Sequence, residues 1–298
     1  MSIRLSERIR NYSKNFSKGQ KLIAKYIEEY PDKVAFMTAS KLGVTVGVSE
    51  STVVRFATEI GYSGYPALQQ AMQEMIRNKL TSLQRLEMTS SNIEKEKLLE
   101  MVLDQDVNII RRTKENIDKK AFYDVVKALV GAKRVYILGA GSSWALATFM
   151  THYFNLIFDN VVLIEATGES QIYQQMIRVG EDDAVIAISF PRYSKKATRA
   201  LQYGKANGAS TIAVTDSVHS PLAVNAMHSL LARSDMVSFV DSLVGPLSLI
   251  NALIVNVAIE KKAEVSEVFR KIEDIWEEYS VYEKVDEEKK EEVLAENN

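Results

Sequence analysis

Five short apolar runs alternate with helical patterns in the second half of the chain, from about residue 119 onward. Runs that are apolar on both faces are typical of strands buried in a parallel sheet, and the helical patterns between them predict the covering helices. We therefore expect an α/β domain with a doubly wound, mostly five-stranded parallel sheet. The runs are RVYIL (134–138), VVLIE (161–165), AVIAIS (184–189), TIAVT (211–215) and the weaker HSLLA (228–232).

Glycines and hydroxyl side chains follow the first and third runs, in GAGSSW (139–144) and in SFPRYSKKAT (189–198). Backbone amides and hydroxyls at a strand-to-helix turn can hold one phosphate group. Both turns are expected at the carboxyl edge of the sheet, where ligands of such folds bind. We therefore predict a pocket for a small phosphorylated molecule, with candidate residues Gly139, Gly141, Ser142, Ser143, Glu169, Ser189, Arg192 and Ser194.

The composition excludes several other classes of site. The 298 residues include no cysteine and only three histidines, so disulfides and thiolate metal sites are excluded and a histidine cluster has little material. No apolar run approaches the roughly 18 residues of a membrane-spanning helix, and the N-terminus has no apolar signal-like core. We expect a cytoplasmic protein without a membrane partner, a metal ion or a cofactor.

The formal net charge of −2 conceals a basic N-terminus. Residues 1–25 carry seven basic side chains against the single acid Glu7, whereas residues 281–298 carry seven acids against three bases. Basic segments suit nucleic acid because neutralised phosphates release counterions. An exposed, solvated helix face would show the same charge pattern, so charge alone leaves both interpretations open.

A helix-turn-helix is predicted in ASKLGVTVGVSESTVVRFAT, residues 39–58. This motif needs a small residue where the two helices cross and a glycine at the turn, and Gly43 and Gly47 are suitably placed. Ser49 suits the N-cap of the second helix. That helix would present short hydroxyls and Arg55 to base edges or phosphates. The predicted DNA-binding residues are Lys41, Ser49, Ser51, Thr52 and Arg55.

The segment around this motif resembles the N-terminal domain of RpiR-family bacterial transcription regulators over about residues 3–78. GVSESTVVRF followed by GYSGYPAL is the most specific part of the likeness. The chain departs from the family in KLGVTVGV, which has an extra glycine and β-branched residues, and at Thr58 and Glu59, where the family tends to be basic. The resemblance implies operator DNA as a partner, with a larger contribution from the basic residues of 4–25.

Residues from about 120 to 250 resemble the sugar isomerase (SIS) domain, a flavodoxin-like fold that binds phosphosugars and follows the helix-turn-helix in this family. The resemblance implies that Ser142 and Ser143 belong to a first phosphate loop and that Ser189 begins a second. SFPRYSKKAT departs from the common S-x-S-G-x-T form, with Ser194 as the best match to the second serine. The expected function is therefore that of a regulator that responds to a sugar phosphate.

Two alternatives stay open at this point. A sugar-phosphate isomerase would need a base beside a carbonyl, for which Glu169 and His219 are candidates. A regulator that senses a nicotinamide cofactor would use GAGSSW as a G-x-G-x-x-G fingerprint, with Glu165 as the ribose-binding acid. Trp144 stands at the third glycine position of that fingerprint, where a side chain of its size does not fit.

The domain organisation follows from these segments. We predict a DNA-binding domain over 1–78, a helical linker over 79–118, a sensing domain over 119–262, and a C-terminal helix with an acidic, fraying tail over 263–298. An apolar helix is expected at 241–262, either in the core of one chain or between two. We expect a homodimer or homotetramer.

Overall fold

The computed structural model describes residues 5–77, 81–86, 95–165, 168–235 and 238–282. The predicted acidic tail therefore lies almost wholly outside the described residues. The chain divides into two compact units, Met1–Gln105 with Asp235–Ser242, and Asp106–Ser234 with Leu243–Asn298. The division falls inside the segment expected to link the domains, and the predicted boundaries at residues 78 and 118 stay predictions.

The first unit is built from short helices around one apolar core. Its helix α2 begins with a complete capping box, in which Ser17 and Gln20 each bind the other's backbone amide. Buried side chains from several helices meet in the core, among them Ile23, Leu42 and Phe56. The helices are α1 (Leu5–Tyr12), η1 (Ser13–Asn15), α2 (Lys18–Glu29), α3 (Pro31–Val34), α4 (Ala39–Val46), α5 (Glu50–Glu59), α6 (Tyr65–Arg77) and η2 (Lys95–Lys97).

The second unit contains the predicted sheet. All five strands pair in parallel in the order β2-β1-β3-β4-β5, which confirms the expected doubly wound, flavodoxin-like sheet. Strand order reverses between β1 and β3, so the switch point lies at the ends of these two strands. The strands are β1 (Arg134–Gly139), β2 (Val161–Leu163), β3 (Asp183–Ile188), β4 (Ser210–Thr215) and β5 (His228–Leu231).

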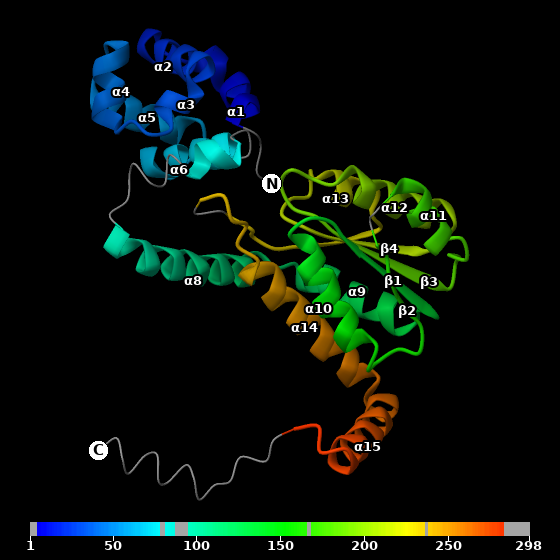
Figure 1. Cartoon of the computed structure of the whole chain (residues 1–298). Coiled ribbons are helices and arrows are strands. Elements are labelled where there is room, and N and C mark those ends of the chain that lie inside the picture. Colours follow the sequence, from blue (N-terminus) through cyan, green and yellow to red (C-terminus); the bar gives the residue numbers. More distant parts are fainter. Residues whose placement is uncertain (1–4, 78–80, 87–94, 166–167, 236–237, 283–298) are drawn as a thin grey trace, which may run out of the picture. The chain divides into compact units, whose positions relative to one another are not determined.

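Helices cover both faces of this sheet (Figure 1). One face packs against α9 (Lys119–Val130), α10 (Ser143–Phe154) and α14 (Val244–Glu260), and the other against α11 (Glu169–Gln175), α12 (Lys195–Ala206) and α13 (Pro221–Asn225). The fully buried β3 explains why its sequence is a continuous apolar run.

The remaining helices are α8 (Leu98–Asn116), which spans the division between the units, and α15 (Lys262–Glu278). The predicted helix over 241–262 is observed as α14, which buries Leu249, Ile250 and Leu253 in the core of its own unit. Among the described residues, no single helix is long and apolar enough to cross a membrane. Within the described ranges, one helix pair, α14 and α15, passes that test of length and composition when taken together, and it is bent by 100°.

Candidate functional sites

The turn between α4 and α5 has the local geometry of a helix-turn-helix. Helix α4 ends at Gly47, whose φ of 75° lies in the left-handed region that favours glycine. Ser49 then accepts a hydrogen bond from the backbone amide of Thr52 and caps α5. Both turn residues named from the sequence therefore act as expected in this local structure.

Gly43 allows the two helices of the motif to approach closely. A Cβ atom at this position would lie 2.8 Å from the backbone oxygen of Val48 and 3.3 Å from the amide nitrogen of Glu50. These are backbone atoms that cannot move aside without shifting α5. The amide of Val48 also donates a 2.8 Å hydrogen bond to the carbonyl of Gly43, so the close contact helps to fix the turn.

The outward face of α5 carries the predicted DNA-binding residues. Ser49, Ser51 and Arg55 are exposed, as is Lys41 on α4, and Thr52 is half-buried. The hydroxyl oxygen of Ser49 lies 2.9 Å from those of both Ser51 and Thr52. The arrangement places a small hydroxyl cluster at the start of α5 and a guanidinium one turn further on. Their roles on DNA stay predictions.

Two contacts of the first unit were not foreseen from the sequence. The Arg8 guanidinium donates hydrogen bonds of 3.0 and 2.9 Å to the carbonyls of Ile60 and Gly61, beyond the end of α5, and lies over the ring of Tyr62. Gln20 donates to the carboxylate of Glu59. Arg8 thus has a structural role at the C-terminus of the predicted reading helix, although its charge resembles that of its basic neighbours.

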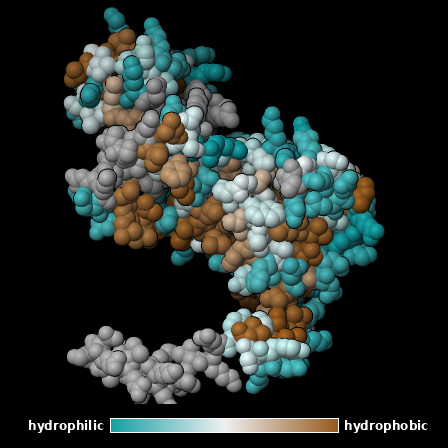
Figure 2. Space-filling model, viewed as in Figure 1, coloured by the Kyte–Doolittle hydropathy of each residue, from teal (hydrophilic) through white to brown (hydrophobic). Residues whose placement is uncertain are grey.

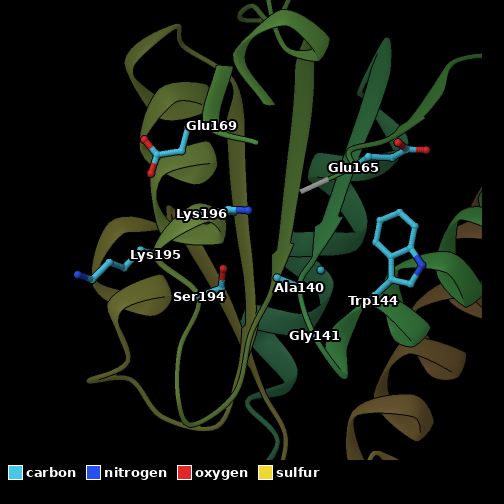
Figure 3. A pocket seen from close by; sticks show the side chains of 9 residues that line it. Ala140, Gly141, Trp144, Glu165, Glu169, Ser194, Lys195 and Lys196 are labelled. Carbon is cyan, nitrogen blue, oxygen red and sulfur yellow. The ribbon is translucent and has the colours of Figure 1, made fainter. Parts of the chain in front are cut away.

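A pocket of about 680 Å³ opens at the carboxyl ends of the strands, at the switch point between β1 and β3. This volume is typical of small-molecule sites. In Figure 3, Trp144 and Glu165 stand on one side, Ser194 and Glu169 stand on the other, and Ala140 lies between them. The lining residues are Gly139, Ala140, Gly141, Trp144, Glu165, Glu169, Ser194, Lys195 and Lys196.

Four of the eight predicted ligand residues line this pocket, namely Gly139, Gly141, Glu169 and Ser194. The other four are not among its lining residues. Ser142 immediately precedes α10, whereas Ser143 is 3% exposed within the first turn of that helix. Ser189 is buried at the end of β3, and Arg192 is exposed, with a φ of 71° that is unusual for a side chain of its type. Direct binding by any of the eight stays a prediction.

The loop that follows β3 is held by hydrogen bonds at both ends. The amide of Ser194 donates to the hydroxyl oxygen of Ser189 over 3.0 Å. The Tyr193 hydroxyl donates to the carboxylate of Asp216 over 2.9 Å, which ties the loop to the end of β4. Burial raises the pKa of Asp216, against the lowering effect of the hydrogen bond from Tyr193.

The two pocket carboxylates are held differently. Glu169, the first residue of α11, forms an ion pair with Arg199 of α12. Glu165 follows β2, and its backbone amide and carbonyl bind the side-chain amide of Gln175 at 3.0 and 3.3 Å. The ion pair holds the Glu169 carboxylate, whereas Gln175 holds only the backbone of Glu165.

The predicted ligand set omitted part of the pocket lining. Ala140 and Trp144 lie in the predicted phosphate turn 139–144, and Glu165 was considered only for a nicotinamide cofactor. Lys195 and Lys196 directly follow the predicted Ser194. Their proximity to the predicted serines was the available signal. The predicted set took its charged residues from Glu169 and Arg192 and did not include the two lysines.

Two family models match separate parts of the chain. The rpiR-family helix-turn-helix domain matches residues 3–79, and the SIS domain matches residues 128–256. The chain belongs to the RpiR family of transcriptional regulators. This confirms the resemblance seen in the sequence, in which a helix-turn-helix domain is followed by a SIS domain.

Relatives that match most of the chain are described as HTH-type transcriptional regulators. An uncharacterized HTH-type transcriptional regulator of Clostridium perfringens is 26% identical over 217 residues, which cover 72% of this RpiR-family chain and 77% of the relative. The regulator HexR of Escherichia coli is 24% identical over 220 residues, covering 73% of each chain.

Solved structures agree in fold. The sugar isomerase domain of an RpiR transcription factor from Sphaerobacter thermophilus superimposes with a TM-score of 0.57 at 27% identity, over 60% of this chain and 99% of that one. The Vibrio vulnificus NanR protein, complexed with ManNAc-6P, has a TM-score of 0.56 at 22% identity, over 90% and 96% of the two chains.

Proposed function

We propose that this RpiR-family regulator binds operator DNA through α4 and α5 and responds to a small sugar phosphate in the pocket at the β1–β3 switch point. The observation that carries the proposal is the presence, on one chain, of a helix-turn-helix and of a ligand-sized pocket in a SIS fold. The complex of NanR with ManNAc-6P supports the effector class, since that protein has the same fold.

The effector would act by binding two arrangements of the protein unequally. A ligand can shift DNA affinity only by its differential affinity for the two states, which typically amounts to about 1–3 kcal/mol. We therefore expect the effector to change the dissociation constant for operator DNA by about 5- to 150-fold.

A catalytic role is less well supported by the pocket. Its candidate base, Glu169, already forms an ion pair with the guanidinium of Arg199. His219, the other candidate, is exposed and is not a lining residue. Turnover of a sugar phosphate by the purified protein would favour the isomerase alternative.

The nicotinamide alternative retains one supporting observation, because Glu165 lines the same pocket as Gly139 and Gly141. Trp144, however, occupies the wall at the position where the fingerprint requires glycine. Tight binding of NADH with quenching of tryptophan fluorescence would favour this alternative.

We also propose a homo-oligomer, formed in part through the outward face of α14. Val255 and Ile259 on this helix are 55% and 64% exposed, opposite the buried face that packs on the sheet. Figure 2 shows apolar surface over α14 and α15. Sedimentation of the Val255→Glu/Ile259→Glu double variant should give a smaller assembly than the wild type. Unchanged sedimentation would exclude this face.

The decisive experiment is fluorescence-anisotropy binding to DNA from upstream of the protein's own gene and neighbouring genes. It should be run at fixed salt with non-specific competitor, because affinity for DNA depends strongly on salt. Specific binding that a sugar phosphate changes would support the proposal and its implied cytoplasmic location. Binding no tighter than to scrambled DNA, with and without candidate effectors, would reject it.

A further inference from the structure

Two lysines and two glutamates supply the charged side chains of the proposed effector pocket. Lys195 and Lys196 open α12, whereas Glu165 and Glu169 follow β2 and begin α11. The lysines could bind the anionic group of a ligand while the glutamates accept hydrogen bonds from its hydroxyl groups.

The serines expected to form a hydroxyl array contribute less to this pocket than the sequence suggested. Ser143 and Ser189 are 3% and 4% exposed, and neither is a lining residue. Ser194 does line the pocket; its oxygen accepts a hydrogen bond from Ala197, and its hydroxyl proton can still be donated. Because the loop after β3 offers only one hydroxyl donor to the pocket, a nearby positive charge would add strongly to the binding of a phosphate or carboxylate.

The two lysines differ in direction although they are consecutive. Successive residues of a helix point about 100° apart, and Figure 3 shows Lys196 extending toward the loop that carries Ala140, whereas the amine of Lys195 points away. Lys195 is exposed and Lys196 is half-buried. A half-buried ammonium inside a pocket attracts an anion more strongly than an exposed one, because the surrounding dielectric is lower.

The opposite wall suits a hydroxylated carbon skeleton. Trp144 is 37% exposed and offers an apolar ring face, and the Glu165 carboxylate can accept hydrogen bonds from hydroxyl groups. Figure 3 places both side chains across the pocket from Lys196.

We propose that Lys196 holds the anionic group of the effector, and that the pocket recognises a polyhydroxylated anion by charge. An ammonium is a point charge without the planar, forked geometry that would select one oxyanion. The pocket is therefore expected to accept sugar acids as well as sugar phosphates. This inference rests on the proposed function only in taking this pocket as the effector site.

The test compares the wild type, Lys196→Ala and the neighbouring Lys195→Ala as full chains. Calorimetric titration with hexose and pentose phosphates, the matching sugar acids and the neutral sugars would identify the tightest ligand. Inorganic phosphate, followed by tryptophan fluorescence, serves as a minimal anion. Charge-assisted hydrogen bonds justify an expected 10- to 100-fold loss for both anion classes in Lys196→Ala, with less than about 3-fold loss in Lys195→Ala.

Several outcomes would overturn the inference. Equal losses in the two variants would indicate general electrostatic attraction, and wild-type affinity in Lys196→Ala would remove that residue from the site. The inference would also be overturned if neutral sugars bound as tightly as the anions, or if no anion bound at all. Specific DNA binding that still responds to a sugar phosphate would then leave the proposed function standing without Lys196.

Discussion

The backbone amide of Ser194 donates a 3.0 Å hydrogen bond to the side-chain oxygen of Ser189, across the loop that joins β3 to α12. Ser189 is buried at the end of a central strand, so its hydroxyl fixes the position at which α12 begins. The direction of Lys196, two residues further along, depends on that starting point. A serine outside the pocket thereby helps to shape it.

Replacing Ser189 with alanine should lower the unfolding free energy of the sensing unit by about 1–3 kcal/mol, because the amide of Ser194 loses its acceptor. Effector affinity should fall as well. Urea unfolding, followed by tryptophan fluorescence, measures the loss of stability. A Trp276→Phe background leaves Trp144 as the reporter. The exposed Ser170→Ala is the control; equal stability of the two variants would contradict the assigned role.

Replacing Gly43 with alanine should destabilise the helix-turn-helix by about 1–3 kcal/mol, because the new Cβ would lie 2.8 Å from the backbone oxygen of Val48. Mass spectrometry should show this destabilisation as faster amide hydrogen exchange across α4 and α5. Gly180→Ala is the matched control, since a Cβ there has nothing within 4 Å. Wild-type exchange in the Gly43 variant would mean that the helices can separate without cost.

Replacing Arg8 with alanine removes both hydrogen bonds to the carbonyls that follow α5 and the contact with the Tyr62 ring. A loss of about 1–3 kcal/mol in the stability of this unit is expected, together with faster exchange near residues 57–62. The exposed Arg10→Ala serves as the control. If Arg8→Ala weakened DNA binding without any change in exchange, its role would be phosphate contact instead.

Replacing Arg55 with alanine should weaken specific DNA binding by about 10- to 100-fold, as expected for a guanidinium that contacts a base or phosphate. Anisotropy titrations at several salt concentrations would separate the two cases. Loss of a phosphate contact reduces the salt dependence and affects all sequences alike. Lys205→Ala, on the exposed face of α12, should bind as the wild type does. Unchanged affinity would remove Arg55 from the DNA-binding surface.

The carboxyl group of Asp216 should make stability depend on pH. Burial raises its pKa in the folded state, so the neutral form is favoured there. Its stabilising contribution is complete below the unfolded pKa and is lost as pH rises through the higher folded value. Asp216→Asn, which keeps an acceptor for Tyr193, should therefore gain unfolding free energy relative to the wild type as pH rises from 4 to 7. A difference that stays constant with pH would contradict this.

The features that sequence predicted well depend on local patterns. Continuous apolar runs located the strands because both faces of β3 are buried, and Gly47 and Ser49 marked the turn because their conformations depend on residue type. The predicted ends were less accurate; the strand expected over 161–165 closes at Leu163.

The features that sequence missed depend on contacts between distant residues. Arg8 meets the carbonyl of Ile60, which is 52 positions away, and nothing in the local sequence distinguishes it from the neighbouring basic residues. The position of Ser143 on α10 buries its side chain outside the pocket. The different directions of Lys195 and Lys196 depend on where α12 begins. Residue types near the strand ends identified the pocket, but side-chain direction was needed to identify what lines it.

At the switch point, the segments that line the pocket differ from the contacts that hold the sheet together. The strands are held by their own parallel ladders, while the pocket is lined from short segments that follow β1, β2 and β3. Exchanging those segments would alter what the protein detects while leaving the sheet intact. The scaffold is thus suited to divergence in nature and to the engineering of biosensors, with a single reporter tryptophan already in the pocket wall.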